Sequence, residues 1–256
     1  MMPLWFSITS KDSIYKGKED QYVDVEHEPW AQGLRQVYPA IKEELLRYLE
    51  GNDMVPYFHQ GMVNKKDRWK TIGLKFWNIE MERYKKHFPV AYRWLEQNRE
   101  VVSMSFSLLE PFSRILPHSG DTNGIYRVHL GMWVPEGLPR CGFRVREEKR
   151  GWKEKEFLAF IDAFEHEAWN ETEKSRCIMM LDVIRPEFRK RQGYICRQVI
   201  AALALQKMAA LLLIHNHKPN ARPLNIPLWF RKVMAYCMLV PVSIVLPVRR
   251  AWMRLK

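Results

Sequence analysis

The first hundred residues carry a hydrophobic period typical of helices. Between residues 30 and 49, apolar side chains recur every three or four positions, which predicts an amphipathic helix docked on a core. Residues 88–97 predict a second helix, with Pro89 accommodated in its first turn. Residues 1–27 are mixed and charged without a clear period, so we expect a surface arm there. Residues 52–69 predict a loop.

The pattern then changes to short alternating runs separated by Gly, Pro and Asn, which predict β-strands. Many short strands without intervening helices favour a closed or double-sheet β fold. The charged run at 144–155 predicts a solvated hairpin. The expected strands are 71–77, 101–109, 113–117, 125–134, 142–146, 157–161 and 177–184.

Candidate chemistry centres on the run PHSGDTN at residues 117–123. His118 and His166 lie 48 positions apart, each beside an alternating apolar run, which suits a metal held between two strands. Imidazole suits iron, zinc or copper, and a two-histidine site leaves coordination positions open. His129 is a third candidate ligand, so spacing alone leaves open which two of these three histidines bind the metal together. Each could also be a hydrogen-bonded core histidine.

Further motifs follow this run in order: RVHLGMWVP at 127–135, DAFEHEAWN at 162–170, and Arg176 ahead of an apolar strand. Together they resemble the aspartyl/asparaginyl β-hydroxylase family of iron(II)- and 2-oxoglutarate-dependent dioxygenases over residues 88–186. The resemblance implies a mainly β fold with flanking helices around a double-stranded β-helix (jelly-roll, cupin-like) core. The family includes hydroxylases of Asp and Asn side chains and relatives that hydroxylate acyl chains of lipids such as lipid A.

By this resemblance, His118 and His166 bind iron(II), and Arg176 holds a carboxylate of 2-oxoglutarate. The arginine fork suits that role because it grips a carboxylate with two parallel hydrogen bonds. On a strand, residues two apart face the same side, as Arg127 and His129 must if both contact the cosubstrate. The remaining cosubstrate contacts are placed at Ser107, Arg127 and His129.

Gly120 occupies the position where most iron dioxygenases of this fold carry a carboxylate, two residues after the first histidine. The named family shares this glycine, and a water can fill the vacancy. Asp121 and Asp162 are the nearest substitutes in the sequence, and we expect Asp162 beside the metal site as a supporting hydrogen-bond partner. Asn123 is assigned with Gly120 and Asp162 to the immediate surroundings of the metal.

Charge is distributed unevenly along the chain. Of the net charge of +12, residues 185–256 contribute 14 Lys and Arg against one acid, whereas residues 1–184 net −1. The apolar segments 200–214 and 233–248 are shorter than the roughly 20 residues that span a bilayer. Basic flanks on short apolar segments favour contact with an anionic membrane surface. The alternative is a pair of helices packed on the barrel or forming a dimer.

Nucleic acid is not an expected partner, because aromatic residues are not interleaved with the basic ones and no binding motif is present. Four cysteines without a CxxC spacing predict free thiols in a reducing compartment. Residues 1–5 lack the layout of a signal peptide. We therefore expect a cytoplasmic protein at the cytoplasmic face of a membrane, divided into an arm with supporting helices (1–100), a jelly-roll core (101–186) and a basic, apolar helical tail (187–256).

The sequence therefore predicts a hydroxylase that uses iron(II), 2-oxoglutarate and O₂ on an unactivated C–H bond. The tail favours an acyl chain of a membrane lipid over the alternative, an Asp or Asn residue of a peptide. A hypothesis of another class is a catalytically silent jelly-roll binding protein. The intact set of His118, His166 and Arg176 argues against it.

Overall fold

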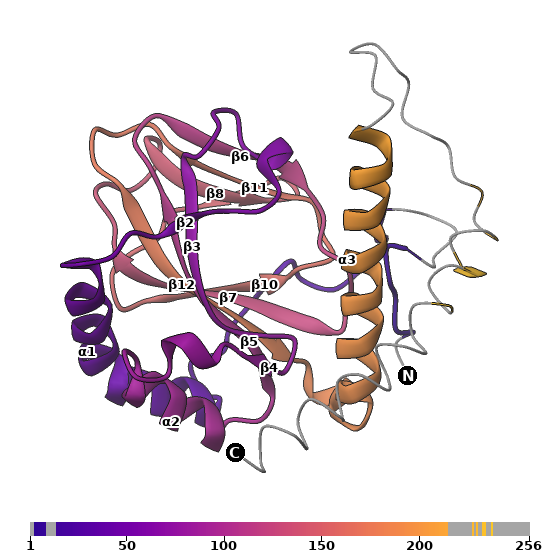
Figure 1. The fold of residues 1–256 in the computed structure, drawn as a ribbon, viewed down its shortest axis with the longest axis horizontal. Helices are drawn as coiled ribbons and strands as arrows, with labels where there is room; N and C mark the ends of the chain where they lie inside the picture. The colour runs from indigo at the N-terminus through magenta and orange to yellow at the C-terminus, as the bar shows by residue number, and fades with distance from the viewer. Residues whose placement is uncertain are drawn as a thin grey trace.

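The computed structural model describes residues 3–8 and 14–214, together with residues 227, 229, 232, 233 and 237; at residue 60 and residues 206–214 it describes the backbone alone (Figure 1). Two antiparallel sheets form the body of the protein, and helices cover one side of the larger sheet. This arrangement confirms the expected mainly β, jelly-roll fold with flanking helices and a C-terminal helix.

Within the described residues the larger sheet has eight strands and the smaller sheet four. The larger sheet runs in the order β1 (Tyr22–Val23), β10 (Phe157–Ile161), β7 (Ile125–Trp133), β12 (Arg176–Ile184), β5 (Val101–Leu109), β3 (Trp69–Phe76) and β2 (Val55–Pro56), with β4 (Ile79–Glu80) paired to β3. The smaller sheet runs in the order β6 (Ser113–His118), β11 (His166–Asn170), β8 (Cys141–Val145) and β9 (Glu148–Arg150).

Each predicted strand has a counterpart in these sheets, and the hairpin of β8 and β9 occupies most of the charged run at 144–155. The alternation did not predict β11, which carries His166. Strands β1 and β3 come from the first hundred residues, yet both are hydrogen-bonded into the larger sheet. The three-part division of the chain stays a prediction.

Both helices predicted in the first hundred residues are present, as α1 (Pro29–Leu49) and α2 (Pro89–Gln97). Apolar residues of α1 and α2 share one core cluster with one face of the larger sheet. Glu44 of α1 accepts hydrogen bonds from the backbone N–H groups of Val90 (2.6 Å) and Ala91 (3.3 Å). It thereby satisfies two of the free donors at the start of α2, which has no capping side chain of its own.

The two faces of the larger sheet have different compositions because side chains alternate along each strand. In β5, Met104 and Phe106 point into the core beneath α1 and α2. Their neighbours Ser103, Ser105 and Ser107 point to the opposite face and line a cavity. This alternation gives the sheet an apolar face for folding and a polar face for chemistry.

The expectation of a surface arm at 1–27 is wrong for part of the described stretch. Phe6 and Tyr22 are buried, and β1 adds a strand to the edge of the larger sheet beside β10. Asn123 fixes the start of the chain, because its amide accepts from the backbone N–H of Trp5 (2.8 Å) and donates to the carbonyl of Pro3 (3.1 Å). Hydrogen bonds to a distant turn thus order a segment that has no hydrophobic period.

The described part of the C-terminal region is helical. The short 3₁₀ helix η3 (Pro186–Arg191) leads into α3 (Gln192–Ile214), whose first turns pack Ile195 and Val199 against the body. No described helix combines the length and apolar character needed to cross a bilayer. Of the predicted apolar segment 233–248, all but positions 233 and 237 lies outside the described residues. Two further 3₁₀ helices are η1 (Gln60–Met62) and η2 (Glu82–Tyr84).

Candidate active site

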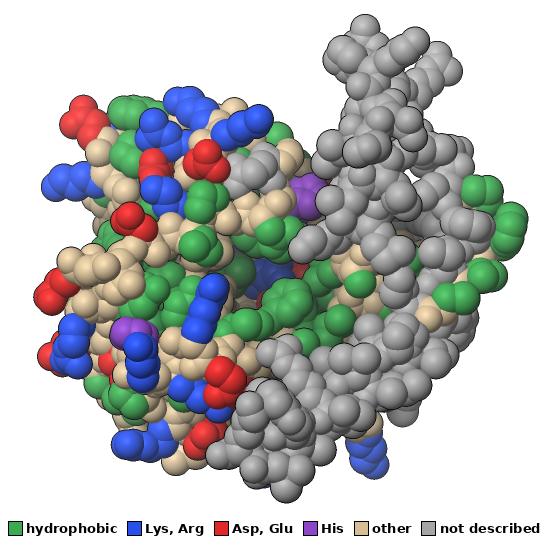
Figure 2. Space-filling view, viewed as in Figure 1, with side chains coloured by type: hydrophobic (Ala, Val, Ile, Leu, Met, Phe, Trp, Pro, Cys, Tyr) green, Lys and Arg blue, Asp and Glu red, His purple; other side chains and the backbone are tan. Residues whose placement is uncertain are grey.

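The polar face of the larger sheet and the smaller sheet enclose a cavity of about 450 Å³. Figure 2 shows it as a hollow with charged side chains at depth and hydrophobic side chains around the rim. Strands β3, β5, β7 and β12 supply one wall, and His118 and His166 come from the smaller sheet. The cavity therefore collects most of the residues that the motifs singled out.

His118 and His166 are direct partners in the pairing of β6 with β11. Their rings lie 4.2 Å apart between centroids. In each ring, Nδ1 lies 2.8 Å from the carbonyl oxygen two residues earlier, Leu116 for His118 and Phe164 for His166. Because a carbonyl oxygen only accepts, each Nδ1 carries the proton. Each Nε2 is then left with a lone pair, the form of imidazole that binds a metal.

Both rings are also held in the neutral state. Burial lowers the pKa of His118 to about 4 and that of His166 well below its ordinary value. Two adjacent neutral imidazoles therefore fit a divalent metal ion such as iron(II). No third His, Cys, Asp or Glu forms a metal-like cluster with them in the described part of the chain. This agrees with the glycine at position 120.

Asp162 explains why position 120 is glycine. A Cβ atom built on Gly120 would overlap the Asp162 carboxylate, so that carboxylate fills the space of the missing side chain. The Gly120 N–H donates to the Asp162 carbonyl oxygen (2.8 Å), and Asp162 Oδ1 lies 3.9 Å from His166 Nε2. The chain thus brings a carboxylate beside the histidines from the turn before β11.

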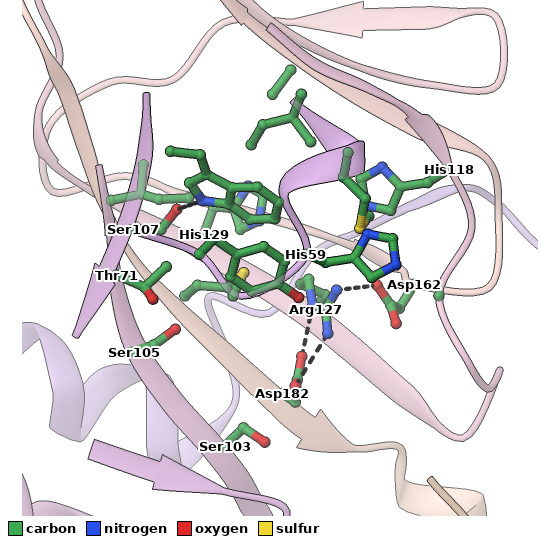
Figure 3. A pocket seen from close by; sticks show the side chains of 18 of the residues that line it. His59, Thr71, Ser103, Ser105, Ser107, His118, Arg127, His129, Asp162 and Asp182 are labelled. Carbon is green, nitrogen blue, oxygen red and sulfur yellow. Dashed lines mark hydrogen bonds and ion pairs between the residues drawn. The ribbon is translucent and has the colours of Figure 1, made fainter. Parts of the chain in front are cut away.

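Arg127 lies between two buried carboxylates (Figure 3). Its guanidinium is 2.7 Å from Asp162 Oδ1 and donates to both oxygens of Asp182, at 2.8 and 3.2 Å. Burial acts to lower the pKa of Arg127, but the two negative charges outweigh it and raise the pKa. Burial raises the pKa of Asp162 to about 7, and Arg127 opposes that rise. The positive charge of Arg127 is therefore already compensated by carboxylates of the protein.

Arg176 has a contrasting environment. Its side chain is 1% exposed, its guanidinium lies over the ring of Trp152 at 4.4 Å, and Nη1 donates to the Ser107 carbonyl at 3.4 Å. Within the described residues no carboxylate pairs with it, and its Nε has no hydrogen-bond partner. Burial lowers its pKa. A buried cation that faces a cavity without a carboxylate partner has the chemistry to bind an anion.

Ser107 and His129 are close enough to Arg176 to complete such a site. Trp152 Nε1 lies 3.2 Å from His129 Nδ1, and because indole N–H only donates, Nδ1 accepts and Nε2 carries the proton. Ser107 Oγ accepts from Trp69 Nε1 (2.9 Å), which leaves its hydroxyl proton available to donate. Both residues thus offer a donor for a carboxylate.

Two features of the cavity were not predicted from the sequence, and one predicted residue lies elsewhere. His59 and Tyr57, which belong to the predicted loop, line the cavity, with His59 beside His118 and Asp162 (Figure 3). Burial raises the pKa of Tyr57 to about 12. Asn123 does not line the cavity, because its amide is committed to the first residues of the chain. No local sequence signal marks His59, whereas Asp182 could have been found from its alternation with Arg176.

Comparisons with known proteins identify the family of this chain. A family model described as aspartyl/asparaginyl β-hydroxylase matches residues 35–186. An ornithine lipid ester-linked acyl 2-hydroxylase of Rhizobium tropici is 34% identical over 163 residues, which are 62% of this chain and 58% of that protein. The aspartyl/asparaginyl beta-hydroxylase of Mus musculus is 39% identical over 136 residues, 51% of this chain and 18% of that protein.

Among solved structures, a prolyl-4-hydroxylase from Pseudomonas putida aligns with a TM-score of 0.39 at 14% identity, covering 64% of this chain and 92% of that one. The chain thus spans little more than half of the Rhizobium relative and less than a fifth of the mouse one. The family model, by contrast, covers more than half of the chain. The protein therefore belongs to the aspartyl/asparaginyl β-hydroxylase family.

Proposed function

We propose that the protein is an iron(II)- and 2-oxoglutarate-dependent hydroxylase whose cavity holds the metal on His118 and His166. The observation that carries the proposal is Arg176, a fully buried guanidinium without a carboxylate partner among the described residues, facing the cavity that holds two neutral histidines. Bound iron, with 2-oxoglutarate and O₂, would supply the oxidising chemistry that converts a C–H bond to an alcohol.

The residues of the chain bind and orient the cosubstrate. Arg176 grips one carboxylate of 2-oxoglutarate, and the Ser107 hydroxyl donates to the same end. His129 contributes its Nε2 proton as a further donor, since its Nδ1 is held by Trp152. Trp152 also covers the guanidinium and keeps water from it, which strengthens the charge-assisted bonds.

Asp162 and Arg127 act as positioning residues on the opposite side of the histidines. Asp162 lies beside His166 in the space next to Gly120, where it can accept a hydrogen bond from water bound near the metal. Arg127 fixes that carboxylate and is itself fixed by Asp182. The ion-pair network therefore orients Asp162 without adding a charged ligand. Asn123 supports the site from a distance by ordering the first residues of the chain.

For the substrate, we infer an acyl chain of a membrane lipid, with an Asp or Asn residue of a peptide as the alternative. The Rhizobium relative, named for an ester-linked acyl chain, supports the lipid. The lining of the cavity includes Phe58, Phe76 and Trp77, which suit a hydrocarbon chain. The basic composition of residues 185–256 adds support for an anionic membrane surface.

The test is succinate formation by the purified protein supplied with iron(II), 2-oxoglutarate and extracted lipids or peptides, followed by mass spectrometry of the products. We expect one oxygen atom to be added to an acyl chain. His118→Ala and His166→Ala should retain no iron and form no succinate. Full turnover by either variant would refute the metal assignment, and oxygen added only to a peptide would select the alternative substrate.

A further inference from the structure

A strap of chain crosses the mouth of the cavity between the two sheets. This mouth strap, residues 55–68, begins with β2, which pairs with β3, and is held there by the Tyr57 N–H donating to the Trp69 carbonyl at 2.8 Å. It then reaches the smaller sheet, where Val63 forms a bridge with Ile115 and Asn64 exchanges two hydrogen bonds with the backbone of Arg114. Hydrogen bonds thus fix both ends of the mouth strap.

The mouth strap turns one aromatic ring inward and the next outward. Tyr57 stacks on Trp69 with ring centroids 3.8 Å apart and lines the cavity. Phe58 lies at the rim of the cavity with 62% of its surface exposed. A well-anchored segment that holds a phenylalanine in water beside a cavity mouth is unfavourable unless another surface covers it.

Exposed apolar side chains concentrate around this strap. Single exposed hydrophobic residues are ordinary on protein surfaces. Here, however, nine large hydrophobic side chains are exposed among the described residues, and four lie on the mouth strap, on β6, which it contacts, or on the loop before β6. The four are Val55, Phe58, Phe112 and Leu116, at 48%, 62%, 49% and 40% exposure.

The same strap carries positive charge. Lys65 and Lys66 are exposed, and neither has an ion-pair partner within the described residues. Arg68 follows them and pairs with Glu110. The mouth strap holds three basic residues and one acid, whereas residues 1–184 as a whole carry a net charge of −1. The strap is therefore a local positive patch on a nearly neutral part of the chain. Apolar side chains next to lysines match the headgroup region of an anionic bilayer, where rings insert and ammonium groups meet phosphates.

We propose that the mouth strap is a membrane-contact surface that seats the cavity mouth on an anionic lipid bilayer. Phe58 enters the headgroup region, while Lys65 and Lys66 contact lipid phosphates. The mouth lined by Tyr57 and His59 then faces the bilayer, so an acyl chain enters without crossing water. The benefit of this membrane contact to turnover rests on the proposed lipid substrate, whereas binding of the strap to the bilayer does not. This contact is separate from any that residues 215–256 make.

Vesicle partition of the full chain tests the proposal. The charge variant is Lys65→Gln with Lys66→Gln, and its matched control removes the same charge from two exposed lysines outside the strap, with Lys18→Gln and Lys86→Gln. The apolar variant is Phe58→Ser, matched by Leu46→Ser on the outer side of α1, which is 49% exposed. All of these proteins keep the same C-terminal region, so differences between matched pairs isolate the strap.

On phosphatidylcholine vesicles containing phosphatidylglycerol, the strap charge variant should lose roughly 30-fold in partition, at about 1 kcal/mol for each lysine. High salt should reduce that difference. Phe58→Ser should weaken binding to neutral and anionic vesicles alike, because its contribution is apolar. Both control variants should bind like the unmodified protein. Equal partition of strap and control variants would overturn the proposal.

A second measurement separates this inference from the proposed function. Succinate formation is compared for a vesicle-held acyl lipid and for the same lipid dispersed in detergent. We expect the charge variant, Lys65→Gln with Lys66→Gln, to lose rate on vesicles and keep it in detergent, because neither lysine lines the cavity. If the unmodified protein forms no succinate on any lipid, the proposed function fails, while the partition result still decides the membrane contact.

Discussion

Two arginines face the same cavity from neighbouring strands, Arg127 half-buried and Arg176 fully buried, and their charged partners differ. Arg127 on β7 is held by two carboxylates, whereas Arg176 on β12 is held by an aromatic ring and one backbone carbonyl. The charge of Arg127 is compensated inside the protein, whereas that of Arg176 has no carboxylate partner among the described residues. Charge compensation is therefore the basis on which we propose a positioning role for Arg127 and a ligand-binding role for Arg176, although both are arginines on the polar face of one sheet.

The largest expected effect comes from removing Arg127, the arginine whose charge is compensated. Arg127→Met should destabilise the protein by about 3–5 kcal/mol, because it leaves Asp162 and Asp182 buried without their shared cation. Urea unfolding of the metal-free protein measures the loss. Arg127→Met combined with Asp182→Asn should recover part of it. A single variant as stable as the unmodified protein would mean that the network contributes nothing.

The sequence predicted the parts of this contrast that depend on local pattern and missed those that depend on residues far apart in the chain. Alternation along a strand placed Arg127 and His129 on one face, and the motifs supplied His118, His166 and Arg176. The carboxylate partners could not be assigned, because the pairing of Arg127 with Asp182 depends on the register of β7 against β12. The overlap of Asp162 with position 120 depends on a tertiary approach that no local pattern encodes.

Strand β11 shows the same limit. Its residues, HEAWN, include three polar side chains, so the hydrophobic alternation is weak. The strand is stable because it pairs on both sides, with β6 and β8, and because Asn170 donates to the carbonyls of Leu109 and Lys174. The docking of residues 3–8 escaped prediction for a related reason, since Asn123 anchors them through hydrogen bonds. In both places tertiary hydrogen bonding replaced the apolar pattern.

The next largest effect tests Arg176, the arginine without a carboxylate partner among the described residues. Arg176→Lys should weaken 2-oxoglutarate binding by about 2–5 kcal/mol, because an ammonium group cannot reproduce the two parallel bonds to a carboxylate. Titration calorimetry or thermal shift with 2-oxoglutarate measures it. Arg176→Met should abolish the shift and leave the ligand-free protein as stable as before or more so, the opposite sign to Arg127→Met. An unchanged affinity for 2-oxoglutarate would place the cosubstrate elsewhere.

A smaller effect tests the packing of Asp162. Gly120→Ala should cost about 1–3 kcal/mol of stability, because the new methyl group displaces the Asp162 carboxylate from beside His166. Gly73→Ala in the same cavity is the matched control, since a Cβ there meets nothing within 4 Å. It should be neutral or slightly stabilising. Equal stability of the two variants, by thermal or urea unfolding, would show that Asp162 moves aside without cost.

The smallest effect for any single group is a pH dependence, in which the histidines and Asp162 act in opposite directions. Burial depresses the pKa of His118, His129 and His166 in the folded protein, so between pH 6.5 and about 4 the unfolded chain binds more protons there. Their contribution to stability is complete above pH 6.5 and is lost as the pH falls, by at most about 1.4 kcal/mol per pH unit for each histidine. Asp162 has a raised pKa of about 7 in the folded protein, so as the pH falls the folded state binds this proton before the unfolded state does. Protonation of Asp162 therefore adds stability as the pH falls below about 7, over nearly the same pH range in which the histidines remove it.

Three histidines outweigh one carboxyl group, so the metal-free protein should lose stability between pH 6.5 and 5. Asp162→Asn removes the opposing group without changing the shape of the side chain, and the loss should then become steeper with falling pH. His118→Gln removes one of the groups responsible for the loss, which should become shallower. Urea unfolding at several pH values, with a chelator present, gives all three slopes. A slope for Asp162→Asn equal to that of the unmodified protein would mean that Arg127 keeps Asp162 ionised throughout, and that the ion pair rather than burial decides its charge.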